Sequence, residues 1–182
     1  MIVGMSEPFS FDPNAYGSAV AALVLPIRVA ELGPGTPNAA ARAALSAFDP
    51  SRDFAQPVRD REAAQACLAG LFLYHDFHDE AHAISQDLPT AEGSFWHAIL
   101  HRREPDPSNS KYWWRQVGSH LVLSRLASET PALGYSYTSP TAFVDFCERV
   151  RGGGTSEEEL AKRVQALEWQ LLFEHCYRKT VG

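Results

Sequence analysis

The stretch from Cys67 to Gln86 constrains the fold most, because it is apolar on two opposite sides when it is drawn as a helix. At 100° per residue, one stripe along the helix begins with Leu68, Leu71 and Phe72 and continues with polar residues. A second, apolar stripe lies on roughly the opposite side and contains Leu73, Phe77 and Ile84. A helix that is apolar on two sides is buried on two sides. We therefore expect a buried central helix, from about residue 58 to residue 86.

The remaining segments also predict helices, and none shows the period-two alternation of a β-strand. Proline and glycine mark the turns between them. A length of 182 residues suits one domain. We expect an all-α fold, an irregular helical bundle that forms a single domain over residues 1–182, with residues 1–14 as an extended N-terminal arm. The other expected helices cover approximately residues 15–25, 38–48, 91–103, 109–118, 120–128, 140–151 and 156–178.

Charge and cysteine content exclude several classes of protein. The net charge of −6 argues against a general nucleic-acid binder, which needs surplus Lys and Arg on one face. The apolar run at residues 18–27 is too short to span a bilayer and contains Pro26, so we expect no membrane partner. Cys67, Cys147 and Cys176 lie far apart without metal-knuckle spacing, which indicates reduced core thiols and a cytoplasmic protein.

The polar half of the first stripe places His75, Asp79 and His82 at spacings i, i+4 and i+7. Burial of such groups costs free energy unless hydrogen bonds, ion pairs or a metal compensate it. Imidazole and carboxylate groups at this spacing can bind one metal or two adjacent metals, as they do in helical-bundle metalloenzymes. We expect these three residues to be metal ligands.

The segment from Gly93 to Glu104 repeats the same spacing in its residues His97, His101 and Glu104. His97 flanks the apolar stripe of this helix, so it is the fourth expected metal ligand, whereas His101 lies further round towards solvent. We assign His101 a catalytic role. Glu104 and Glu80 are the candidates for a general acid or base.

Basic and aromatic residues surround and follow this second segment. Arg and Lys side chains orient carboxylates and phosphates. We therefore expect a small anionic substrate. A structural alternative is that Arg103 points inward and forms a buried ion pair with Asp79. The expected substrate-binding residues are Arg102, Arg103, Lys111, Trp114 and Arg115.

Two motifs resemble those of a family of uncharacterised bacterial and fungal proteins. Residues 72–82, FLYHDFHDEAH, match the pattern YHDFxDExH. Residues 93–106, GSFWHAILHRREPD, match GSFWHAxxHRREPD, and NSKYW at 109–113 matches NxKYW. The resemblance covers about residues 71–120 and departs at His120, which Leu121 follows where the pattern has proline. It implies that the polar residues of these motifs form one site, and it implies no particular reaction.

Three functions are compatible with these residues. The leading hypothesis is a metal-dependent enzyme, a hydrolase or a non-haem oxygenase, with zinc, manganese or iron held by histidine and carboxylate. The second is a metal-free ligand-binding protein or acid–base enzyme that uses a His–Asp pair and the basic cluster. The third is a non-catalytic structural or interaction protein in which the polar stripe is a buried network.

Overall fold

The structure is a computed structural model, and it describes residues 9–182. Part of the expected N-terminal arm, residues 1–8, lies outside the described residues. The arm is shorter than predicted, because Pro13–Tyr16 already forms a 3-10 helix. Phe9 and Phe11 pack against the core, and the Phe11 ring meets the edge of Trp169 at a centroid distance of 5.7 Å.

The described residues confirm the all-α prediction, since they contain helices and no β-strand. Their hydrophobic side chains form one core cluster. The α-helices are α1 (Ser18–Val24), α2 (Arg42–Ala47), α3 (Arg61–Tyr74), α4 (His78–Asp87), α5 (Ala91–Arg103), α6 (Pro107–Val117), α7 (Leu121–Glu129), α8 (Pro140–Val150) and α9 (Ser156–Val181). Further 3-10 helices are Ala39–Ala41 and Thr130–Leu133.

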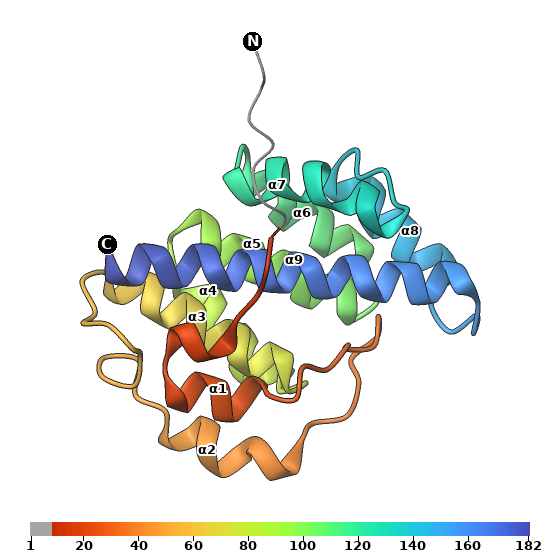
Figure 1. Cartoon of the computed structure of the whole chain (residues 1–182). Helices are drawn as coiled ribbons and strands as arrows, with labels where there is room; N and C mark the ends of the chain where they lie inside the picture. Colours follow the sequence, from red (N-terminus) through yellow and green to blue (C-terminus); the bar gives the residue numbers. More distant parts are fainter. Residues whose placement is uncertain (1–8) are drawn as a thin grey trace.

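The long helix α9 crosses the whole width of the molecule (Figure 1). In that view α6, α7 and α8 lie above it and α1 and α2 lie below it, with α3, α4 and α5 behind. Helix α9 packs against α3, α7 and α8, and α5 packs against α4 and α6. Helix α4, which carries His82, therefore lies beside α5, which carries His97 and His101.

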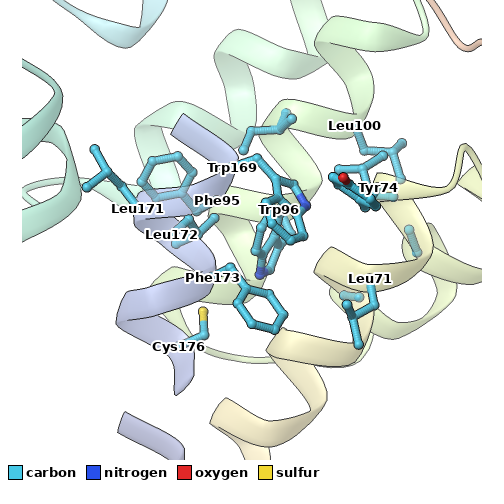
Figure 2. Packing of buried hydrophobic residues seen from close by; sticks show 14 of the residues in the cluster. Leu71, Tyr74, Phe95, Trp96, Leu100, Trp169, Leu171, Leu172, Phe173 and Cys176 are labelled. Atoms are coloured by element: carbon cyan, nitrogen blue, oxygen red, sulfur yellow. The ribbon is translucent and has the colours of Figure 1, made fainter. Parts of the chain in front are cut away.

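Aromatic rings fill the space between α3, α5 and α9 (Figure 2). Trp96 and Trp169 are both buried there, and the Trp169 indole donates a hydrogen bond to the carbonyl of Gly70 at 2.9 Å. A Cβ atom at Gly70 would lie 2.6 Å from the Trp96 ring, so glycine is required at this contact. The close approach fixes α3 against α5.

The expected continuous helix over residues 58–86 is wrong, because the chain breaks between α3 and α4. Asp60 caps the start of α3 by accepting a hydrogen bond from the Ala63 amide. After Tyr74 the backbone turns through Asp76, whose φ of 63° is left-handed and incompatible with a helix. A buried ion pair of Asp76 with Arg103 stabilises this turn, and the Arg103 guanidinium also donates to the Leu73 carbonyl at the end of α3.

Candidate metal centre

The structure brings together His82 of α4 with His97 and His101 of α5. One ring nitrogen of each histidine lies within 4.8 Å of one from each of the others. The Nε2 atoms of His82 and His97 are 3.2 Å apart. Residues four apart on a helix share a face, which places His97 and His101 together, and the packing of α4 on α5 supplies His82.

The carboxylate of Glu104, just past the end of α5, determines the tautomer of His101. Its Oε2 atom lies 2.9 Å from His101 Nδ1, so Nδ1 carries the proton and donates it. The remaining lone pair, on His101 Nε2, accepts a hydrogen bond from the Asn109 amide at 3.1 Å, so a metal on this nitrogen would displace that amide. A histidine held by a carboxylate through one nitrogen, with the other nitrogen available, is the usual arrangement at protein metal sites.

His97 is the most deeply buried histidine of the three, with 1% of its surface exposed. Its ring stacks on Trp113 at a centroid distance of 4.0 Å and an interplanar angle of 17°. Burial, and after it the neighbouring His101 and His82, lower its pKa to about 3. Burial also lowers the pKa of His101. Both imidazoles are therefore neutral at physiological pH, which is the form that binds metals.

The three histidines fit a divalent cation. In a tetrahedral zinc site with Zn–N bonds of about 2.05 Å, ligand nitrogens are about 3.3 Å apart, close to the 3.2 Å between the Nε2 atoms of His82 and His97. The Nδ1 atom of His97 is buried and has no hydrogen-bond partner among the described residues. Three nitrogen ligands would fill three of the four positions of a tetrahedral zinc ion.

Two of the four expected metal ligands do not join this group. His75 caps the end of α3, and its ring contacts the Leu23 carbonyl through Nε2 at 2.8 Å and the Asn38 amide through Nδ1 at 3.0 Å. Asp79 is exposed to solvent on the first turn of α4. The break at Asp76 is the physical reason, because it rotates α4 relative to α3 and destroys the common stripe.

The expected positions of three other residues also need correction. His101 is buried rather than directed towards solvent, with 6% of its surface exposed, and it joins His82 and His97 in the group that could hold a metal. Arg103 does form a buried ion pair, but its partner is Asp76 at 2.6 Å and not Asp79. Glu80 is paired with Arg42, whereas Glu104 contacts His101.

The expected substrate-binding residues do not form one surface. Arg102 is fully buried, with its Nη2 atom 2.5 Å from Glu168 Oε2, so its charge is already neutralised. Lys111 pairs with Asp145, and Trp114 packs in the core with its ring edge against Phe95. Arg115 is exposed and lies over the Tyr112 ring. Helical packing separates side chains that are close together in the sequence.

A second group of histidines and a carboxylate was not predicted. Glu92 of α5 is buried, and its Oε1 atom lies 3.1 Å from His175 Nε2 of α9. The Lys179 ammonium lies 3.1 Å from both carboxylate oxygens, and His120 Nε2 lies 3.9 Å from Oε1. His175 and Lys179 are four residues apart on α9, but Glu92 and His120 lie 28 to 87 residues from their partners on α9 or from each other, so no local period connects the group.

The tautomer of His120 argues against a metal in this second group. The amide of Val122 donates a hydrogen bond to His120 Nδ1 at 3.2 Å, which caps the start of α7. The neutral ring therefore carries its proton on Nε2, the nitrogen that faces Glu92. His120, then His175 and more weakly the Lys179 ammonium, lower the pKa of Glu92 well below its usual range. The group is an anion surrounded by donors.

Comparison of the chain with models of protein families, with curated proteins and with solved structures found no match. The resemblance of residues 71–120 to a bacterial and fungal family therefore stays a prediction. Among residues 9–182, none of the helices has both the length and the apolar character needed to cross a bilayer.

Proposed function

We propose that the protein is a metal-dependent enzyme whose centre is formed by His82, His97 and His101. The observation that supports this is the convergence of three imidazoles from two helices, in which the His97 side chain is only 1% exposed. His97 and His101 are buried and His82 is half-buried, and a divalent cation would bind a lone pair of each ring at one point.

The ligand set favours hydrolytic chemistry over oxygen chemistry. Non-haem iron oxygenases use two histidines and one carboxylate, but Glu104 here is hydrogen-bonded to His101. Three histidine ligands would carry no charge, so they would not offset the positive charge of a bound divalent metal. A metal in such a site would polarise a substrate oxygen and lower the pKa of a bound water. Glu104 positions His101 and strengthens its basicity. The substrate class is not specified by these residues.

The test is the metal content of protein purified without chelators and then dialysed against zinc, manganese or iron(II). We expect about one equivalent of tightly bound metal, most firmly zinc, in the wild type. We expect the same in His175→Ala, the matched control from the second histidine group, and none in His82→Ala. Absence of metal in the wild type would favour the metal-free reading, in which His82 and His97 share a hydrogen bond.

Activity is tested on the zinc-loaded protein with a panel of carboxylic and phosphoric esters. We expect hydrolysis that stops on addition of a chelator, returns with zinc and is absent in His82→Ala. Metal binding in the absence of any hydrolysis across the panel would point to a structural metal centre instead.

A further inference from the structure

A narrow crevice has four walls: the segment after α1 that contains Arg28 and Ala30, the C-terminal end of α3, helix α5 and helix α9. Its walls are mainly apolar and include Leu73, Tyr74, Ile99, Ala166 and Trp169. The crevice is open on one side, and its empty space, with the mouth included, is about 420 Å³. Figure 2 shows Tyr74 and Trp169 beside each other, and their ring centroids are 4.7 Å apart.

Two guanidinium groups, those of Arg28 and Arg103, also line this crevice. Both bind the same carboxylate, since Arg28 Nη2 lies 2.6 Å from Asp76 Oδ2 and Arg103 Nη2 lies 2.6 Å from Asp76 Oδ1. Two cations share one anion, which leaves a surplus of one positive charge at the crevice. A Cβ atom at Gly35 would lie 2.7 Å from the Asp76 carboxylate, so this side of Asp76 is closed by backbone.

The titratable neighbours do not remove the surplus charge. Burial lowers the pKa of His75, and the nearby Arg28 lowers it further. Burial and then Arg103 lower the pKa of His78 to about 4. Both rings are therefore neutral near pH 7 and add no charge of either sign. The side chain of Arg28 is one-third exposed, so its remaining donors reach the mouth of the crevice.

We propose that this crevice binds a small monocarboxylate with an apolar body, the carboxylate on Arg28 and the body against Trp169 and Tyr74. A carboxylate supplies the missing negative charge, and a guanidinium binds it through two parallel hydrogen bonds. An apolar body removes the aromatic walls from water. Pockets with apolar walls and few charged groups are the usual form of small-molecule sites.

The site is distinct from the three-histidine centre. The crevice is lined by Ile99 and Arg103 of α5, whereas His97 and His101 occupy another face of that helix. Occupation of the crevice therefore does not depend on a metal, and each site is tested separately.

Calorimetric titration of the wild-type protein, with and without chelator, uses benzoate and hexanoate as probes. We expect saturable binding that the chelator leaves unchanged and that raises the melting temperature. The neutral isosteres benzamide and hexanamide lack the charge, and acetate lacks the apolar body, so each is expected to bind at least about tenfold more weakly. Equal binding of acids and amides, or no saturable binding of either acid, would overturn the proposal.

Two variants locate the site. Arg28→Gln leaves Asp76 paired with Arg103, so the protein is expected to fold, to keep its metal content and to bind benzoate at least about tenfold more weakly. Ala166→Leu is expected to fill the crevice and block both probes, with urea unfolding as the check that it is folded. Arg115→Gln, the exposed-arginine control, is expected to bind like the wild type. Unchanged binding in Arg28→Gln and in Ala166→Leu would place the probes elsewhere and refute this assignment.

Discussion

The molecule contains two groups of histidine and glutamate that look alike in composition and differ in the direction of their hydrogen bonds. In the group around His97, Glu104 accepts a hydrogen bond from His101 Nδ1, so the lone pair of the ring is on Nε2, and the ring lies beside two other imidazoles. In the group around Glu92, the backbone occupies the Nδ1 atom of His120 and turns its Nε2 proton towards the carboxylate. The first group presents acceptors to a common point, and the second presents donors to an anion.

The difference shows that proximity of ligand-type residues does not identify a metal site. Both groups have ligand atoms within 4.8 Å of one another. A lysine ammonium in contact with the only carboxylate, as for Lys179 and Glu92, repels a cation and supplies the charge that a metal would supply. Under the proposed function, the hydrogen-bond partners of each ring decide which of the two groups could hold a metal.

The largest expected effect is on metal affinity in His97→Ala. Loss of one of three imidazole ligands is expected to weaken zinc binding by more than about a hundredfold, beyond the effect of losing a supporting group. Competition with a coloured zinc chelator measures it. The control is His175→Ala, and equal zinc affinity in the two variants would remove the distinction between the groups.

Glu92→Gln is expected to destabilise the fold by roughly 3 kcal/mol, because His120, His175 and Lys179 lose the anion that they surround. This loss of folding free energy is at the lower end of the range for breaking a buried ion pair, because the Lys179 side chain is partly exposed to solvent. Urea unfolding measures the loss. Zinc affinity is expected to stay at the wild-type value, and a large decrease would show that Glu92 is a ligand.

Glu104→Gln is expected to weaken zinc binding by about ten- to a hundredfold while the fold remains stable. The amide oxygen still accepts the proton of His101 Nδ1, but without the charge that makes the imidazole more basic. The same competition assay measures it. Wild-type affinity in this variant would mean that Glu104 does not position His101.

Acid is expected to destabilise the wild type through Glu92. Its folded-state pKa is lowered, with the neighbouring His120 and His175 as the main causes, so its contribution is present above the unfolded value of 4.5. That contribution is lost progressively as the pH falls below about 4.5. Melting temperatures from pH 6 to pH 3 should therefore fall more steeply in the wild type than in Glu92→Gln, and parallel curves would contradict this.

The smallest expected effect concerns the cap of α7. His120→Ala removes the acceptor for the Val122 amide and is expected to cost about 1 kcal/mol. His120→Asn restores a cap through its side-chain oxygen and is expected to recover most of the loss, as measured by urea unfolding. Full stability in His120→Ala would show that the Nδ1 bond does not fix the tautomer.

Much of the fold could be predicted because local signals are strong. The expected helix starts at residues 140 and 156 agree with α8 and α9, which Ser139 and Thr155 cap. The expected start at residue 109 was late, because Asp106 caps α6 and accepts a hydrogen bond from the Asn109 amide. The pattern from Cys67 to Gln86 indicated the burial up to Phe77 but not the break after α3, since a long-range ion pair stabilises the turn at Asp76.

The sequence alone determined that the chain is helical and that His97 and His101 lie four residues apart on one helix, although it directed His101 towards solvent. Only the tertiary structure decided which residues join them. Packing of α4 on α5 brought in His82 and left Asp79 in solvent. It also assembled the group around Glu92 from three helices. Such contacts depend on the angle and register of packed helices, which no local period specifies.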